Sequence, residues 1–238
     1  MSVAPLPPSP PTPRARPQAV APPLENGDRL TRHEFERRYA SMPHVKKAEL
    51  IEGIVYMACA VRLTRHGRPH AQLIAWLTYY AGKTGIPDYG DNSTVRLDED
   101  NEPQPDLLML LPAVAGGTAR LDDDGYVTGP PDLACEVASS SVSLDTHAKL
   151  NAYRRNGVRE YLVWRVDDRA IDWYALREGL YQPLPATPDG ILKSELFPGL
   201  WLNTPALLAS DLPQVWATID QGLVTPEHAA FAKKLRPN

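Results

Sequence analysis

The chain has 238 residues, a length that suits one domain with flanking tails, and 43% of them are apolar, which is enough for a sizeable core. Its formal net charge of −4 argues against a broad, non-specific DNA-binding surface. No apolar run approaches the roughly 18 residues of a membrane span, and no apolar segment follows a basic start as in a signal peptide. We therefore expect a cytoplasmic protein without a membrane partner.

Cysteine usage favours the same compartment. The only two cysteines, Cys59 and Cys135, lie in apolar, strand-like contexts, so we expect two buried free thiols in a reducing environment. They form no CxxC pair, and a structural zinc site therefore has no support.

Charge is distributed unevenly along the chain. Residues 29–70 contain nine Lys or Arg and four Asp or Glu, whereas residues 71–136 contain three Lys or Arg and twelve Asp or Glu. An acidic block beside a basic one is typical of a metal centre next to a phosphate-facing surface. For any single residue, ordinary solvated charge is the commoner explanation.

The N-terminal segment predicts a tail followed by the first ordered elements. Residues 1–24 contain nine prolines and cannot build a ladder or a core, so we expect a disordered or polyproline-like tail. "TRHE", Thr31 to Glu34, has capping-box spacing and predicts a helix to about Tyr39. "AELIEGIVYMA" then predicts a hairpin that turns at Glu52 and Gly53.

The middle of the chain alternates helical and strand signals. "HAQLIAWLTYYAG" has helical spacing and predicts a long amphipathic helix ending near Gly82. Two continuous apolar runs, Leu107 to Leu111 and Leu133 to Val137, predict central strands covered on both faces. The twenty residues from Pro112 to Pro131, rich in Gly, Pro and Asp, predict a long loop of the kind that forms functional lids or mobile segments.

The C-terminal third predicts one more helix and several strands. "SLDTHAKLNAYRRNGV" reads as a helix that stops at Asn156 and Gly157, followed by the buried strand "REYLVWRV", a hairpin partner and shorter strands. A final helix runs to about Gln221. We predict a single α/β (α+β) domain over residues 25–221, a mixed sheet flanked by helices, with a C-terminal tail over residues 222–238.

Three carboxylates begin or interrupt the predicted central strands: Asp106, Asp132 and Glu136. An ionised Glu136 inside a buried strand costs several kcal/mol or more unless a partner compensates it. If the two strands are neighbours, Asp106 and Glu136 can share one Mg²⁺ or Mn²⁺, and we expect this cation, rather than a protein side chain, to compensate Glu136. Asp132 lies about 13 Å from Glu136 along the strand and is more simply a strand-entry residue.

A basic residue is expected beside such a centre. Lys149 lies on the helix that follows the strand of Glu136, four residues after Asp145. The alternative for Lys149 is a surface ion pair with Asp145, worth a few tenths of a kcal/mol.

The motifs "ELIEG", "PQPDLLML", "PPDLACEVASSS" and "DTHAKLNAYRRNGVREYLVW" occur in this order and resemble the Uma2 family of endonucleases, within the PD-(D/E)xK nuclease superfamily. The resemblance runs from about Leu30 to Leu208. It implies that Pro105 and Asp106 form the PD element, that Glu136 is the acidic residue of the (D/E)xK element, and that Lys149 is a lysine displaced from the strand to the following helix.

The sequence departs from the family pattern at two places. "EVASSS" lacks the proline that usually follows Glu136 in the E-V-aliphatic-S-P-S motif, and Glu52 stands where Asp is frequent. Neither change removes a group of the predicted centre.

Several other residues have two readings each. Glu52 is either a further metal-side carboxylate or a turn residue, and His70 either contacts a phosphate or caps and packs its helix. Three arginines either touch a nucleic-acid backbone or line a solvated loop; they are Arg62, Arg65 and Arg68. Ser139 to Ser141 have no G-x-S-x-G elbow to support a nucleophile.

These patterns predict a metal-dependent endonuclease that hydrolyses phosphodiester bonds of nucleic acid, most simply DNA. Asp106 and Glu136 would hold Mg²⁺ or Mn²⁺, a backbone carbonyl near Val137 would be a further ligand, and Lys149 would orient the water or stabilise the charge on phosphorus. Two alternatives stay open. One is a catalytically inactive nuclease-like module that associates with DNA or protein, and the other is a metal phosphoesterase acting on a small nucleotide. A homodimer is compatible with any of them.

Overall fold

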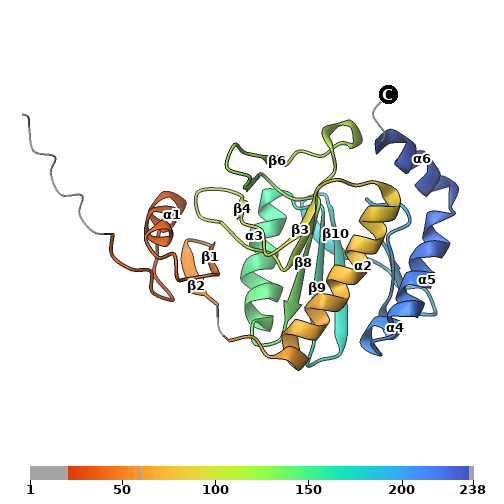
Figure 1. Cartoon of the computed structure of the whole chain (residues 1–238), viewed down its shortest axis with the longest axis horizontal. Coiled ribbons are helices and arrows are strands. Elements are labelled where there is room, and N and C mark those ends of the chain that lie inside the picture. Colours follow the sequence, from red (N-terminus) through yellow and green to blue (C-terminus); the bar gives the residue numbers. More distant parts are fainter. Residues whose placement is uncertain (1–20, 59, 236–238) are drawn as a thin grey trace, which may run out of the picture.

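Strand β8, Leu133–Ala138, is buried along its whole length because it is covered on both faces. The computed structural model describes residues 21–58 and 60–235 of the chain. In it, β8 lies inside a six-stranded sheet of order β11-β10-β9-β8-β5-β3, parallel to β9 and antiparallel to β5. Helices flank this sheet (Figure 1), so the mixed α/β fold predicted from the sequence is confirmed.

The strands form the central sheet and three small sheets, β1-β2, β12-β13 and β4-β7-β6. Their bounds are β1 Ala48–Ile51, β2 Ile54–Met57, β3 Tyr89–Asp91, β4 Val95–Arg96, β5 Leu107–Met109, β6 Arg120–Leu121, β7 Val127–Thr128, β8 Leu133–Ala138, β9 Glu160–Arg165, β10 Ala170–Arg177, β11 Leu180–Pro183, β12 Ile191–Lys193 and β13 Trp201–Asn203.

The last three helices follow one another at the C-terminal end, and two earlier helices are preceded by a π-helical turn. The helix bounds are α1 Arg32–Ala40, α2 Arg68–Thr84, α3 Lys149–Asn156, α4 Thr204–Leu208, α5 Leu212–Leu223 and α6 Pro226–Leu235, with π-helical turns η1 Leu63–Gly67 and η3 Leu144–Ala148 and the 3-10 turn η2 Ala113–Ala115. No helix in the described part of the chain combines the length and the apolar character needed to cross a membrane.

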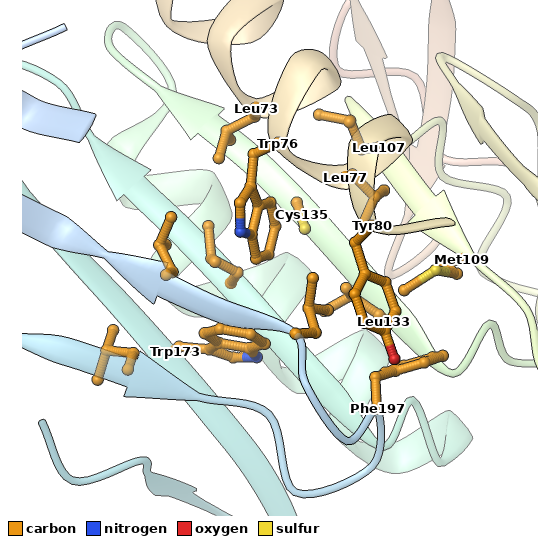
Figure 2. Packing of buried hydrophobic residues seen from close by; sticks show 14 of the residues in the cluster. Leu73, Trp76, Leu77, Tyr80, Leu107, Met109, Leu133, Cys135, Trp173 and Phe197 are labelled. Atoms are coloured by element: carbon orange, nitrogen blue, oxygen red, sulfur yellow. The ribbon is translucent and has the colours of Figure 1, made fainter. Parts of the chain in front are cut away.

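Alternate residues of β8 pack against different helices, as the period of two in a strand requires. Leu133, Cys135 and Val137 belong to the large core under α2 and α5, where Trp76 and Trp173 meet edge to face (Figure 2). The other face of β8 packs against α3, through Ala134 and Ala138 together with Tyr153, Val158, Tyr161 and Val163. Glu136 belongs to this second set of positions, and the strand therefore directs it toward α3.

The β1-β2 hairpin and α1 form a smaller layer with its own apolar cluster, built around Phe35, Leu50 and Val55. The predicted turn is confirmed: Glu52 and Gly53 both have positive φ, 54° and 71°, as a two-residue hairpin turn requires. Leu24 is 3% exposed and packs in the same cluster, so the folded part begins before the predicted boundary at residue 25. The prediction for residues 1–20 and that for Cys59 lie outside the described residues.

Three predicted details differ from the structure. Thr31 makes no side-chain cap to α1, and the Glu34 carboxylate, which would complete a capping box, is bonded to Arg37 and Arg38. Helix α2 continues beyond Gly82 to Thr84, and Gly85, with a φ of 83°, forms its left-handed C-cap. Residues 226–235 of the predicted C-terminal tail form α6, in which Phe231 is buried.

The predicted long loop between β5 and β8 is also more ordered than its composition suggests. It contains η2 and the two short strands β6 and β7, and β7 pairs in parallel with β4. Val127 is buried against Val95, Leu108 and Leu110. This packing fixes the segment against the edge of the domain rather than leaving it as a lid.

Candidate active site

Asp106 and Glu136 occupy opposite positions on neighbouring strands. Leu107 of β5 pairs with Cys135 of antiparallel β8, and one further step in this register sets Asp106 against Glu136. Side chains at opposite positions of an antiparallel pair lie on the same face of the sheet. Both carboxylates are buried, with 3% and 2% of the residue exposed. The two strands are therefore neighbours, which is the condition that the sequence analysis set for Asp106 and Glu136 to share a cation.

Glu136 is compensated by two protein side chains. Its Oε1 accepts hydrogen bonds from Lys149 Nζ at 3.0 Å and from the hydroxyl of Tyr153 at 3.0 Å. Burial raises the pKa of Glu136 to about 8, and the ammonium of Lys149 opposes this rise. The expectation that a metal ion, rather than a protein partner, compensates Glu136 was therefore wrong, because α3 brings a buried cation directly over the strand.

Lys149 is the first residue of α3, directly after the π-helical turn η3, and only 3% of it is exposed. Its Nζ lies 2.8 Å from Glu49 Oε1, 3.0 Å from Glu136 Oε1 and 3.7 Å from Asp145 Oδ1. Burial lowers the pKa of Lys149, but the three carboxylates more than offset this and raise it well above its ordinary value. The alternative of a surface pair with Asp145 is excluded by this burial.

Asp106 has a different set of donors. Its Oδ2 accepts from the backbone N–H of Val137 at 2.8 Å, and its Oδ1 lies 3.2 Å from Lys47 Nζ and 3.6 Å from His66 Nε2. Burial alone would raise the pKa of Asp106, but the charges of Lys47, His66 and Lys149 lower it overall. Asp106 is thus held in its ionised form at neutral pH.

Two histidines at the start of α2 bind the main chain of the same strands. His66 Nδ1 donates to the carbonyl of Val137 at 3.1 Å, and His70 Nε2 donates to the carbonyl of Asp106 at 2.9 Å. The rings lie 5.5 Å apart. His70 therefore lies at the centre but bonds to the backbone of Asp106, which neither of its two predicted roles specified.

Two acidic residues singled out in the sequence lie elsewhere. Glu52, at the hairpin turn, is ion-paired with Arg155 and is not brought to the centre. Asp132 precedes β8, is 2% exposed, and accepts from the backbone N–H of Leu111 and from Arg159. It ties β8 to β5 and β9, in keeping with a strand-entry residue.

The sequence reading missed four residues of the centre. Lys47 and Glu49 come from the N-terminal hairpin, His66 from η1 and Tyr153 from α3. Glu49 is also held by the backbone N–H of Gln104 at 2.7 Å. Only Tyr153 had a local signal, since it lies four residues after Lys149 on the same helix face. The other three depend on how the hairpin and η1 dock against the sheet.

The donor chemistry of this centre fits a hard divalent cation only in part. Carboxylate oxygens of Asp106 and Glu136 and the carbonyl of Val137 are ligands that Mg²⁺ and Mn²⁺ prefer. Each of these three groups is hydrogen-bonded to a protein donor, namely Lys47, Lys149 or His66. Over residues 21–58 and 60–235, no three His, Cys, Asp or Glu side chains are arranged to hold a metal ion. A bound cation would therefore take over ligands that these donors now occupy.

The mixed α/β fold of this chain is shared with solved structures. One is the crystal structure described as a putative nuclease belonging to DUF820 from Anabaena variabilis, which is 11% identical, covers 77% of this chain and 97% of its own, and superposes with a TM-score of 0.51. The chain belongs to the Uma2 family, described as "Putative restriction endonuclease", whose family model matches residues 32–205. No curated protein matches the chain.

Proposed function

We propose that this protein is a metal-dependent endonuclease that hydrolyses phosphodiester bonds of DNA. The observation that carries the proposal is that Asp106, directly before β5, lies opposite Glu136 of β8 in the sheet register, and that the Lys149 ammonium of α3 is bonded to Glu136. Membership of the Uma2 family supports the same activity. The proposed compartment is the cytoplasm.

In this proposal Asp106, Glu136 and the carbonyl of Val137 hold Mg²⁺ or Mn²⁺. Such an ion, when bound, lowers the pKa of a ligand water and neutralises charge on the phosphate. Lys47 and His66 now donate to Asp106 and to the Val137 carbonyl. With an ion on those two oxygens, the two side chains would be free to donate to the substrate beside them. They supply hydrogen-bond donors to the non-bridging phosphate oxygens.

Lys149 serves as a charged donor rather than as a base. The three carboxylates around it raise its pKa well above the ordinary value, so it stays protonated at neutral pH. Glu49 and Asp145 fix its position, and it in turn orients Glu136. Preorganised charge of this kind stabilises the pentavalent phosphorus without reorganisation during the reaction.

The test is a cleavage assay with Mg²⁺ and with Mn²⁺ on supercoiled plasmid and on single-stranded DNA. Wild type should nick or linearise the plasmid, and Glu136→Gln should be inactive while keeping its thermal transition. The matched control is Glu52→Gln, which removes a nearby carboxylate that the centre does not use. Cleavage by Glu136→Gln at the wild-type rate would refute the assignment.

A second candidate function is a nuclease-like module that binds nucleic acid without cutting it. It is favoured by the pairing of each site carboxylate with a lysine, because such a centre is electrically satisfied without a metal ion. The same assay separates the two functions: the inactive module shows neither cleavage nor any thermal shift with Mg²⁺.

A further inference from the structure

The segment that leads from β2 into α2 carries positive charge only. Residues 60–68 read "AVRLTRHGR" and contain three arginines and no acidic residue. All three arginines are exposed. Only Arg65 has an ion pair within the described residues, an exposed contact with Asp167, and Arg62 and Arg68 have none. A protein of net charge −4 thus concentrates unpaired positive charge in one short segment.

The same segment exposes two large apolar side chains. Val61 is 65% exposed and Leu63 is 69% exposed, and they flank Arg62. Single exposed apolar residues are common, but here two of them alternate with arginines on one strip of chain. Apolar side chains beside arginines are the combination with which proteins wedge open base steps while holding the adjacent phosphates.

This segment is attached directly to the candidate active site. His66, inside it, donates to the Val137 carbonyl at 3.1 Å and has its Nε2 3.6 Å from Asp106 Oδ1. In Figure 1 the segment enters α2 at the lower end of the molecule, beside the tip of β8 and the start of α3. Arg62 and Arg68 lie four residues before and two residues after His66, on the same short segment, so they are the arginines that a nucleic-acid backbone bound at the centre would meet along this segment.

We propose that residues 60–68 bind a DNA duplex across the scissile phosphate, with Arg62 and Arg68 on the backbone and Val61 and Leu63 as a wedge between bases. The wedge loosens the stack so that the scissile phosphate can approach the buried carboxylates, which an undistorted backbone reaches less easily. This inference rests on the proposed function for its substrate, but it concerns binding and is tested without cleavage.

The first experiment measures binding of a fluorescent duplex as a function of salt, with Ca²⁺ replacing Mg²⁺ and gels confirming that the DNA stays intact. Each phosphate contact contributes about 0.9 to the slope of log affinity against log salt concentration. Arg62→Gln and Arg68→Gln should each lower the slope by about this amount. The matched control is Arg120→Gln, an exposed arginine on β6 at the opposite end of the molecule in Figure 1, which should leave the slope unchanged.

The second experiment replaces the wedge. The double variant Val61→Ser, Leu63→Ser should bind a fully paired duplex on the order of tenfold more weakly than wild type does. It should bind a duplex with a central mismatch almost as well as wild type does, because the bases at the mismatch are already partly unstacked. Equal weakening on both duplexes would overturn the wedge. Unchanged slopes in both arginine variants, or wild-type binding to single strands only, would overturn the duplex contact.

The two proposals fail in different ways. If wild type binds the duplex with the expected arginine dependence but does not cleave with Mg²⁺ or Mn²⁺, the endonuclease proposal fails and the binding segment stands. If wild type cleaves, and the arginine and wedge variants bind and cleave as wild type does, the binding segment fails and the endonuclease proposal stands. All four substituted positions are exposed, so thermal transitions of the variants should match wild type.

Discussion

Lys149 Nζ lies 3.0 Å from Glu136 Oε1, and both residues are almost fully buried. A buried pair of this kind contributes little compared with an apolar pair of the same shape, but removing one partner leaves the other charge uncompensated. Because Lys149 also contacts Glu49 and Asp145, one ammonium holds three carboxylates together. The stability of the fold and the geometry of the candidate site therefore depend on the same residue.

Lys149→Met should destabilise the protein by about 3–5 kcal/mol at pH 7, because it leaves three buried carboxylates without their cation. Urea unfolding followed by tryptophan fluorescence measures the change. Adding Glu136→Gln and Glu49→Gln to Lys149→Met should recover part of the loss. If the triple variant is no more stable than Lys149→Met alone, the carboxylates are not the source of the destabilisation.

Mg²⁺ at millimolar concentration should raise the melting temperature of wild type, because a ligand that binds only the native state stabilises it by mass action. At a free Mg²⁺ concentration one hundred times Kd, the free energy of unfolding rises by about 2.7 kcal/mol. Asp106→Asn and Glu136→Gln should each abolish the shift, whereas Glu52→Gln should retain it. Differential scanning calorimetry with and without Mg²⁺ gives the comparison. A shift that persists in Asp106→Asn would place the ion elsewhere.

The buried carboxyl of Glu160, which lies outside the candidate site, should make the stability of the protein depend on pH. It is 1% exposed, and burial raises its pKa to about 7 from an ordinary 4.5, against the lowering effect of the Leu196 and Glu195 N–H groups and the Ser194 hydroxyl. A carboxyl whose pKa is raised by folding stabilises the native state at low pH and loses that contribution as pH rises from about 4.5 through about 7.

Glu160→Gln should remove this dependence while keeping the acceptor for both backbone N–H groups. At pH 8 the variant should be more stable than wild type by roughly 2–3 kcal/mol, and at pH 4.5 the two should be nearly equal. Urea unfolding at both pH values measures the difference. Parallel stability curves for wild type and variant would exclude Glu160 as the titrating group.

Asp132 should prove to be a structural residue rather than part of the site. Asp132→Ala leaves the Leu111 N–H without its acceptor and Arg159 without its carboxylate, and should cost about 1–3 kcal/mol or somewhat more. DNA cleavage at a temperature well below the melting transition should be unchanged. Loss of cleavage in folded Asp132→Ala would bring Asp132 into the mechanism.

Leu24 marks the start of the folded part. It is 3% exposed within the cluster of Phe35, Leu50 and Val55, so Leu24→Ala should cost about 2 kcal/mol through the cavity that it leaves. A chain that begins at residue 21 should melt at the same temperature as the full-length protein, because a segment so rich in proline is not expected to build a ladder or a core. Thermal melts of wild type, Leu24→Ala and the shortened chain test both predictions. A lower melting temperature for the shortened chain would show that the tail packs on the domain.

The parts of the fold that the sequence predicted well are those with a local signal. The buried run of β8, the Glu52-Gly53 turn and the stop of α3 at Gly157 each depend on neighbouring residues alone. The short strands β6 and β7 have two residues each, too few to show a period of two, and their order comes from pairing with β4. This is why the segment that contains them resembled a loop.

The candidate site divides in the same way. Asp106 and Glu136 were found because carboxylates at central strands are unusual in sequence, whereas Lys149 was assigned through the resemblance to the family, which places a lysine on the following helix. Lys47 and Glu49 were not found, because they belong to a hairpin that looks like any exposed hairpin until it docks beside β8. The compensation of Glu136 by Lys149 depends on burial of a long side chain, which no helical pattern reveals.

The residues of the candidate site are made at different times during synthesis of the chain. Glu49 and Lys47 leave the ribosome early, but Glu136, Lys149 and the parallel partner strand β9 follow only after most of the domain has been made. No N-terminal fragment that ends before α3 contains Asp106, Glu136 and Lys149 together. The candidate site is therefore complete only once the chain has been made through α3 and has folded.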